Sequence, residues 1–422
     1  MQPAARISAA IEILIEIAAA TEAADRVVDR YFRNRRYAGK QDRAAINGIV
    51  WYALRRQGSI AHLTGEAASP RLTAMAAAVL SGFTDAATLE GWCTGEGHAP
   101  APLSAAERAG LGRLATVGDV PDCVAGDYPE SLDPLLRRRF GDRLGAVMAA
   151  MAGRAPLDLR VNTLKATREE VLGELAGLGL RAVPCALSPV GIRIEGRERL
   201  GQLAPFAEGR IEVQDEGSQL VALACAARPG QAIADYCAGA GGKALALAAA
   251  MNGQGRLLAL DVEERRLSRM KPRLERAGIA GFVETAAISP ELMAREAGAF
   301  DCVLVDAPCS LSGTWRRNPA ARWSLTPDRV AELAELQGQI IDEAARLVRP
   351  GGRLVYATCS VFMEEDEDVV AGFLTRHPDF APLALEQALP GIMDNGLGVA
   401  LDPAAQGTDG FFVSAVTRAS AG

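Results

Sequence analysis

Apolar residues recur at helical spacing in the first part of the chain. Ile7, Ile11, Leu14 and Ile15 stand at i, i+4, i+7 and i+8, and residues 42–54 repeat this pattern. Side chains at such spacing share one face of a helix and pack against other helices. We therefore predict a helical domain over residues 1–121.

The pattern changes to short mixed elements over residues 122–210. Residues 157–161 alternate apolar and polar side chains as a half-buried strand does, and residues 191–194 do so again. Between them, Thr167 precedes a predicted helix that extends to Leu178 and has glutamates in its first turn. This alternation predicts a small α+β domain.

From residue 211 onward, candidate strands and helices alternate. The candidate strands are residues 232–236, 256–260, 282–286, 302–305 and 353–358. Helices of ten or more residues separate most of them, which is typical of a mostly parallel, doubly wound α/β sheet covered on both faces. A late strand at 410–416 has no following helix and predicts a final hairpin. We assign residues 211–422 to one α/β domain.

Composition limits the classes of partner and site. The net charge of −7 argues against indiscriminate nucleic-acid binding, but Lys and Arg gather at 30–43, 55–56, 137–139 and 316–322. Neither the eight cysteines nor the three histidines have the spacing of zinc ligands, and the cysteines form no disulfide framework. No apolar run is long enough to cross a membrane, and the N-terminus does not read as a signal peptide. We expect a cytoplasmic monomer without a metal ion.

A glycine-rich turn follows the first strand of the α/β domain. Residues 237–243 read Cys-Ala-Gly-Ala-Gly-Gly-Lys and precede an Ala/Leu helix. Glycines let the backbone approach a ligand, and the helix N-terminus offers free N–H groups. Asp261 ends the second strand, where a carboxylate can accept both hydroxyls of a ribose. The turn lacks the third glycine of the dinucleotide motif, so it predicts a nucleoside cofactor, with S-adenosylmethionine favoured over a nicotinamide.

Two cysteines follow the ends of two other candidate strands. Cys309 lies in the segment Asp306-Ala-Pro-Cys-Ser310, and Cys359 lies in Tyr356-Ala-Thr-Cys-Ser360. Buried cysteines are common as small apolar residues, so either one could be inert. However, the carboxyl ends of parallel strands meet at the edge where doubly wound sheets bind ligands. Two cysteines at this edge, each followed by a serine, indicate an active site that faces the cofactor.

These motifs resemble the Nol/Nop/Sun family of RNA cytosine-5 methyltransferases, particularly its bacterial ribosomal RNA branch. The matching segments are residues 213–220, 235–243, 306–310, 313–319 and 350–360. Residues 159–165 are similar to the family's small RRM-like RNA-binding module, and residues 30–56 resemble its helical NusB-like domain. The resemblance implies a Rossmann-like class I methyltransferase domain, S-adenosylmethionine as cofactor and ribosomal RNA as substrate.

The resemblance also implies chemical roles. Cys359 matches the nucleophile that adds to carbon 6 of cytosine and thereby makes carbon 5 reactive toward a methyl group. Cys309 matches the residue that promotes release of the product, and Asp306 would hold the ring edge near N3 and the amino group. No histidine adjoins Cys359, so another positive charge or a dipole must favour its thiolate. The target base must also leave any stack to reach both sulfurs.

Further residues are assigned to the cofactor and to RNA. The expected cofactor-binding residues are Asp235, Cys237, Ala238, Gly239, Ala240, Gly241, Gly242, Lys243, Asp261, Asp306 and Pro308. The expected RNA-binding residues are Arg35, Arg36, Arg43, Arg160, Asn162, Arg316, Arg317 and Arg322.

The chain departs from the family pattern at several positions. Leu311 stands where a small residue is usual, Ala244 replaces a Thr, Ser131 replaces a Trp, and Met363 and Asp366 replace a Pro and an Asn. The third strand ends in alanines, without an acid to bind the adenine amino group. These changes bear on turnover more than on the fold.

Three alternative functions follow from the same residues. A non-catalytic RNA-binding relative acting in ribosome assembly agrees with Leu311 but leaves both cysteines unexplained. An amino-group methyltransferase would have an aromatic residue at the position of Cys309, in an Asn/Asp-Pro-Pro-aromatic turn. A nicotinamide dehydrogenase would be supported by the glycine turn alone.

Overall fold

The computed structural model describes residues 1–20, 22–65, 69–115, 120–196, 201 and 203–420. The chain forms two compact units, Met1–Gly153 with Trp315–Leu325, and Arg154–Thr314 with Thr326–Gly422. The division into three domains at residues 121 and 210 stays a prediction. Within the described ranges, no helix has the length and apolar character needed to cross a membrane.

The first unit is helical. Its elements are α1 (Pro3–Ala19), α2 (Ala24–Asn34), α3 (Lys40–Arg55), α4 (Gln57–Thr64), α5 (Pro70–Leu80), α6 (Ala86–Trp92), α7 (Ala105–Gly112), α8 (Asp122–Ala125), α9 (Asp133–Phe140), α10 (Leu144–Ala152) and the 3-10 segment η6 (Pro319–Ser324). The apolar stripe predicted for the first helix is buried at Ile7, Ile11 and Leu14. Ile15 was wrongly placed in it: its side chain is 50% exposed, and Ile13 is buried instead.

The second unit begins with a small antiparallel sheet. Its strands are β1 (Leu157–Val161), β2 (Ala182–Pro184), β3 (Gly191–Ile194) and β4 (Ile211–Val213), in the order β2-β3-β1-β4, with α11 (Arg168–Gly177) and α12 (Ala204–Ala207). Thr167 caps α11 as predicted: its hydroxyl accepts the Glu170 N–H at 3.2 Å, and the Glu170 carboxylate accepts the Thr167 N–H at 2.8 Å.

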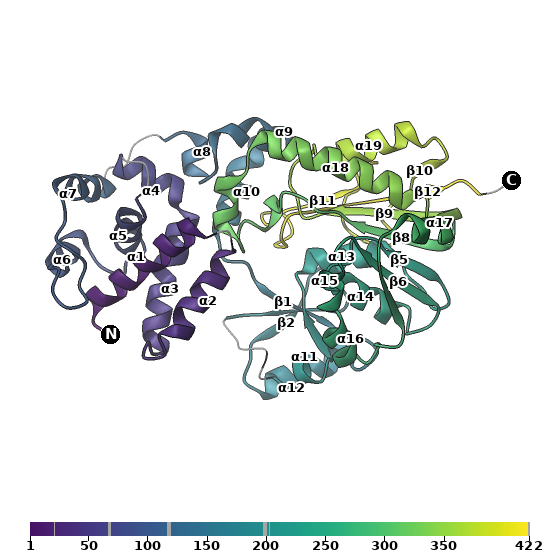
Figure 1. Cartoon of the computed structure of the whole chain (residues 1–422), viewed down its shortest axis with the longest axis horizontal. Helices are drawn as coiled ribbons and strands as arrows, with labels where there is room; N and C mark the ends of the chain where they lie inside the picture. The colour runs from purple at the N-terminus through teal and green to yellow at the C-terminus, as the bar shows by residue number, and fades with distance from the viewer. Residues whose placement is uncertain (21, 66–68, 116–119, 197–200, 202, 421–422) are drawn as a thin grey trace. The chain divides into compact units, whose positions relative to one another are not determined.

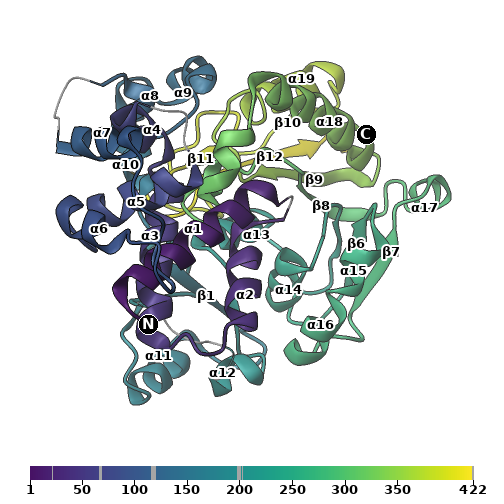
Figure 2. The same cartoon turned by 60° about the vertical axis from the view of Figure 1, so that its left-hand side comes forward.

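The large sheet confirms the predicted doubly wound arrangement (Figure 1, Figure 2). Its strands are β5 (Ala232–Asp235), β6 (Arg256–Asp261), β7 (Val283–Ala287), β8 (Phe300–Asp306), β9 (Val348–Thr358), β10 (Phe380–Pro382), β11 (Val399–Leu401) and β12 (Phe411–Arg418). The order is β10-β12-β9-β8-β5-β6-β7, with β11 on β12. Neighbours from β9 to β7 are parallel, whereas β12 pairs antiparallel with β9, as expected for the late strand.

Helices cover both faces of this sheet (Figure 1). They are α13 (Glu216–Ala224), α14 (Gly242–Ala250), α15 (Glu264–Ser268), α16 (Lys271–Ala277), α17 (Pro290–Arg295), α18 (Pro327–Ala345) and α19 (Glu367–Arg376). Successive strand residues enter opposite cores: Ile233 packs with α13 to α16, and Ala234 packs with α18 and α19. This two-sided burial explains why the central strands are continuously apolar in sequence.

Candidate active site

The predicted catalytic and cofactor residues gather in one cavity of about 390 Å³. It lies where β5, β6, β8 and β9 end, because parallel strands bring their carboxyl ends to the same edge. Of the predicted set, Gly241 alone does not line it. The φ of Gly241 is +81°, and a Cβ there would meet the Met270 side chain, so this position requires glycine for its backbone.

Asp261 is bonded to the glycine turn. Its carboxylate accepts the N–H groups of Gly239 and Glu263, each at 3.0 Å, and it is 2% exposed. The carboxylate therefore holds the turn and still borders the cavity, where the sequence predicted a contact with ribose hydroxyls.

Asp235 is a buried carboxylate without a hydrogen-bond partner. It is 1% exposed, neither oxygen has a partner in the described structure, and it lines the cavity. Burial and the negative charge of Asp306 raise the pKa of Asp235 to about 7. An unpaired buried carboxylate favours a cationic ligand, and the ammonium group of a methionine moiety has that charge. The cavity therefore fits S-adenosylmethionine at this end.

The unusual pKa of Asp235 makes the stability of the cofactor-free protein depend on pH. Between pH 4 and 7 the folded Asp235 holds a proton that the unfolded chain has released, so stability falls as pH rises through this range. We expect Asp235→Asn to remove this loss, which amounts to at most about 4 kcal/mol. Urea unfolding at pH 5 and pH 8 measures it. A variant-minus-wild-type difference that is equal at the two pH values would contradict the assignment.

Lys243 supplies the positive charge that sequence analysis required but did not locate. Its ammonium pairs with Asp306, and it is 9% exposed. Burial lowers the pKa of Lys243, but the Asp306 carboxylate and the charge of Cys359 outweigh it, so the net pKa is raised. Lys243 therefore stays charged and can stabilise a Cys359 thiolate.

The two cysteine thiols face each other at 3.4 Å. Hydrogen bonding to Cys359, burial and nearby negative charge raise the pKa of Cys309 well above that of a free thiol. The raised pKa favours the thiol form of Cys309, and either sulfur can donate across this contact. Cys237 also lines the cavity, but burial and Asp235 raise its pKa, so it is a poor nucleophile.

Leu311 is a strained residue beside these thiols. Its φ is +59°, a left-handed conformation that costs a branched side chain about 1–2 kcal/mol. The side chain lines the cavity and is 46% exposed, so little apolar burial depends on it. This geometry explains why a small residue is expected at this position.

We expect Leu311→Gly to raise the free energy of unfolding by about 0.5–1 kcal/mol, since relief of strain exceeds the added flexibility of the unfolded chain. Chemical denaturation measures this change. Asn252→Gly is the matched control: its φ is +52°, but asparagine tolerates this conformation, so its gain is smaller. Equal gains at both positions would argue against strain at Leu311.

Half of the predicted RNA-binding residues are not surface residues. Arg160, Asn162, Arg316 and Arg322 are 4%, 8%, 5% and 0% exposed. Arg160 donates to the Gln214 side chain and to the Gly242 carbonyl at 2.7 Å. Asn162 bonds the carbonyls of Gly209 and Ala277, and Arg322 bonds that of Asp127. The side chains of Arg160, Asn162 and Arg322 thus bond groups of the fold, and RNA binding by these four residues stays a prediction.

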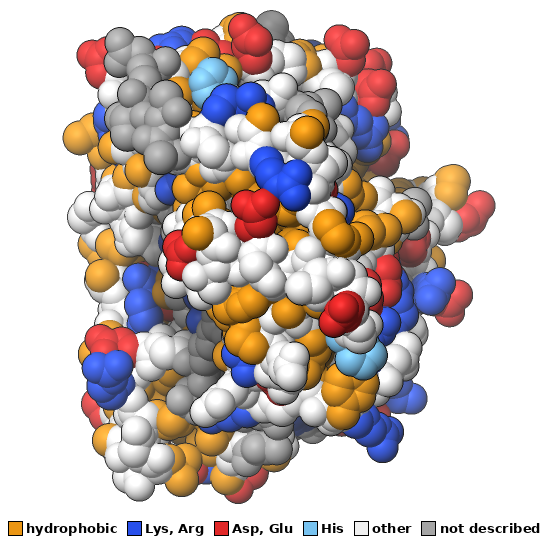
Figure 3. Space-filling view, turned by 90° about the vertical axis from the view of Figure 1, so that its left-hand side faces the viewer, with side chains coloured by type: hydrophobic (Ala, Val, Ile, Leu, Met, Phe, Trp, Pro, Cys, Tyr) orange, Lys and Arg blue, Asp and Glu red, His pale blue; other side chains and the backbone are white. Residues whose placement is uncertain are grey.

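The remaining predicted RNA-binding residues are accessible to different degrees. Arg36 and Arg317 are exposed. Arg35 pairs with Glu12 at 3.1 Å and stacks on Tyr31, and Arg43 donates to the Ala38 carbonyl at 2.8 Å. On the face that Figure 3 shows, basic and acidic side chains are interspersed, without one large basic patch. RNA binding by Arg35, Arg36, Arg43 and Arg317 stays a prediction.

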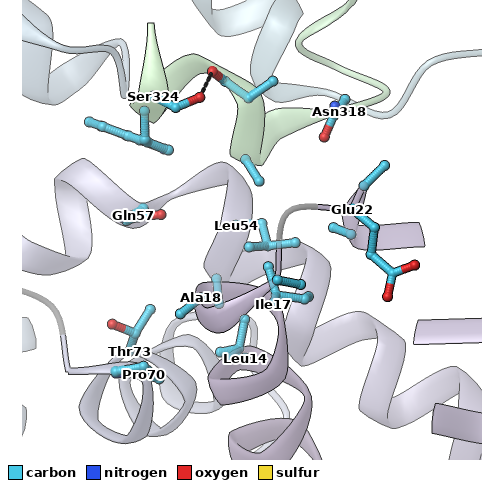
Figure 4. A pocket seen from close by; sticks show the side chains of 17 residues that line it. Leu14, Ile17, Ala18, Glu22, Leu54, Gln57, Pro70, Thr73, Asn318 and Ser324 are labelled. Carbon is cyan, nitrogen blue, oxygen red and sulfur yellow. Dashed lines mark hydrogen bonds between the residues drawn. The ribbon is translucent and has the colours of Figure 1, made fainter. Parts of the chain in front are cut away.

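Two other features lack the groups for catalysis. A cavity of about 620 Å³ in the helical unit is lined by side chains of α1, α3, α5 and η6, most of them apolar (Figure 4). Among its described lining residues, Glu22 is the one titratable group. Asp158, Cys185 and Glu216 have the proximity of metal ligands. However, Arg193 donates to both Asp158 oxygens at 2.7 and 2.8 Å and to Glu216 at 3.4 Å, so a guanidinium already bonds the carboxylates of this cluster.

Sequence reasoning missed several polar residues of the site. Gln214 and Ser218 line the cavity, and the motif at 213–220 was the signal that could have found them. Glu365 and Gln337 form a buried hydrogen bond of 2.9 Å behind the cysteines. No local motif marked either residue, because most of their partners are distant in sequence.

Comparison with known proteins gives consistent similarities. Residues 222–417 match the family model described as 16S rRNA methyltransferase RsmB/F, and residues 128–199 match the ferredoxin-like domain of RsmF/B-like methyltransferases. The Bacillus subtilis protein named "Probable ribosomal RNA small subunit methyltransferase B" is 35% identical over 272 residues, 62% of this chain. The Salmonella typhi protein named ribosomal RNA small subunit methyltransferase B is 37% identical over 60% of this chain. The match spans 59% of the length of each relative.

Solved structures share the fold. The crystal structure of PH0851 is 28% identical, covers 99% of both chains and has a TM-score of 0.79. NSun6 from Pyrococcus horikoshii, solved with SFG, is 20% identical and covers 70% of this chain and 99% of its own, with a TM-score of 0.63. A methyltransferase homologue from Pyrococcus horikoshii is 27% identical over 70% of this chain and 97% of its own, with a TM-score of 0.59.

Proposed function

We propose that this protein methylates carbon 5 of a cytosine in small-subunit ribosomal RNA. The chain belongs to the RsmB/F family of methyltransferases, because residues 128–199 and 222–417 match the two family models. The donor is S-adenosylmethionine, which supplies an electrophilic methyl group when bound. The observation that carries the proposal is the pair of thiols 3.4 Å apart in the cavity of the glycine turn. Methyl transfer to an amino nitrogen or to a ribose hydroxyl needs no covalent adduct with the base, so it would leave both facing thiols without a role.

The residues around the cavity divide the work. Asp235 would hold the ammonium group of the cofactor, and Asp261 its ribose. The Cys359 thiolate, favoured by Lys243, adds to carbon 6 of the base, so that carbon 5 gains nucleophilic character. Asp306 would stabilise the charge that develops on the ring. After methylation carbon 5 gives its proton to solvent water. The carbon 6–sulfur bond then breaks and returns the electron pair to Cys359, and the Cys309 thiol, which faces that sulfur, promotes this release.

The substrate and the setting are part of the same proposal. A cytosine must be unstacked to reach both sulfurs, which costs least in a single-stranded or looped region. The eight cysteines are free thiols, which supports a reducing, cytoplasmic location. The monomeric state stays a prediction.

The test is methyl transfer from radiolabelled S-adenosylmethionine to small-subunit ribosomal RNA transcribed in vitro, with large-subunit RNA as the control. Digestion to nucleosides identifies the product, and we expect label in 5-methylcytidine. Label in a methylated adenosine or in a ribose would overturn the proposed chemistry. If the protein binds the cofactor measurably but labels no RNA, the proposal that it catalyses methyl transfer is wrong. That result would support the non-catalytic RNA-binding alternative.

A further inference from the structure

Glu365 is a fully buried carboxylate behind the two cysteines. It lies between β9 and α19 and is 0% exposed. One oxygen accepts the Ser310 N–H at 2.8 Å and the Gln337 side-chain amide at 2.9 Å. The other accepts the hydroxyls of Ser310 and Ser360. One carboxylate thus receives four hydrogen bonds.

These bonds join the two segments that carry the thiols. Ser310 directly follows Cys309, Ser360 directly follows Cys359, and their hydroxyl oxygens are 3.3 Å apart. Gln337 of α18 extends the connection, because its side-chain amide also donates to the Pro308 carbonyl at 2.9 Å. Glu365 therefore connects the segment that follows Cys309 with the segment that follows Cys359.

The charge of Glu365 is not needed to hold a cation. All four described donors are neutral groups. Burial of an ionised carboxylate is unfavourable because the charge loses its hydration. The four hydrogen bonds offset this desolvation cost, but the described donors include no cation that would need the negative charge. The charge does act on the site, since Glu365 is among the groups that raise the pKa of Cys309.

We propose that Glu365 is a positioning residue for methyl transfer: it sets the separation of the two thiols and keeps their shared proton on Cys309. This inference rests on the proposed function for its catalytic meaning, but not for its thiol chemistry. Among the described residues, Lys243, paired with Asp306, and Glu365 are charged groups that act on the thiol pair. Lys243 lines the cavity, whereas Glu365 is fully buried and does not. If the Glu365 charge is removed, the positive charge of Lys243 still lowers the pKa of the thiols, and the negative charge of Glu365 no longer raises it.

The first measurement is the rate of Cys359 alkylation by iodoacetamide against pH, followed by mass spectrometry of the Cys359 peptide in the full chain. In the same digest the Cys309 peptide is followed as well. For Glu365→Gln we expect the Cys309 midpoint to move about one pH unit lower, because the negative charge that raises the pKa of Cys309 is removed. Glu367→Gln is the matched control: Glu367 is 3% exposed and lies in the same segment, but it bonds Asn395 at 3.1 Å instead of the serines. Its midpoint should equal that of the wild type.

The second measurement separates position from charge. Glu365→Asp keeps the charge but shortens the side chain, so we expect an unshifted alkylation midpoint and a kcat about 10- to 100-fold lower, with the dissociation constant for S-adenosylmethionine unchanged. This variant also serves if Glu365→Gln fails to fold. Equal midpoints for wild type and folded Glu365→Gln, or an undiminished kcat in Glu365→Asp, would overturn the inference. If the wild type methylates no RNA while Glu365→Gln shifts the midpoint, the proposed function fails and the role of Glu365 in thiol protonation stands.

Discussion

Replacement of Cys359 by alanine is expected to lower the rate of methyl transfer by more than about 10³-fold, since removal of a nucleophile abolishes the covalent route. Carbon 5 of cytosine becomes reactive only after a thiolate has added to carbon 6, and no second thiolate is available. Cys309 keeps its proton, and the pKa of Cys237 is raised by burial. Neither neighbour can therefore replace Cys359.

Single-turnover transfer of label to small-subunit RNA measures this effect. The dissociation constant for S-adenosylmethionine should stay at the wild-type value, because Asp235 and Asp261 remain in place. Cys225→Ala is the control for thiol removal: Cys225 is 1% exposed in the core, directly after the C-terminal end of α13, and does not line the cavity. It is expected to retain transfer. Loss of activity in Cys225→Ala, or retention in Cys359→Ala, would contradict the assignment.

The parts of the site that sequence predicted are those that short motifs encode. The glycine turn, Asp261 and both cysteines lie at the ends of strands, and the topology of a doubly wound sheet brings such ends together whatever the intervening sequence. The strands are apolar because both of their faces are buried, so their positions are also readable. The late antiparallel strand was found because no helix follows it.

Burial of charged side chains was not readable from the sequence. Arg160 was predicted to contact RNA because its segment resembles the RNA-binding module of the family, and Arg322 because it lies in a basic cluster. In the structure the Arg160 guanidinium bonds the Gly242 carbonyl, which lies in the cofactor turn, and burial lowers its pKa to about 9. The sequence shows that a residue is charged, but it does not show which groups that residue bonds in the folded protein.

Glu365 was missed for a related reason. Its partners Ser310 and Gln337 lie 55 and 28 residues away in sequence. Ser310 is in the loop that follows β8, and Gln337 is in α18. These residues meet only because β8 and β9 are neighbours and α18 connects them across one face. The run of acidic residues at 364–368 reads as a solvated helix start, yet Glu365 within it is fully buried.

Replacement of Cys309 by alanine is expected to give the opposite defect from Cys359→Ala: addition to the base proceeds, but release fails. The Cys359 thiolate and its partner Lys243 remain, so the carbon 6–sulfur bond still forms. Release requires loss of the carbon 5 proton and departure of the Cys359 sulfur, and the group facing that sulfur at 3.4 Å is missing. We expect multiple turnover to fall about 10²- to 10³-fold, the usual contribution of one proton-transferring group.

The trapped species distinguishes this defect from simple inactivation. A covalent protein–RNA adduct should survive denaturing electrophoresis, contain at most one labelled methyl group per protein chain, and be absent from the double variant Cys309→Ala with Cys359→Ala. An adduct that persists in the double variant would identify another attacking residue. An inactive Cys309→Ala protein without an adduct would mean that both thiols act in the addition step, so that the proton shared between them, and not product release, is what Cys309 provides.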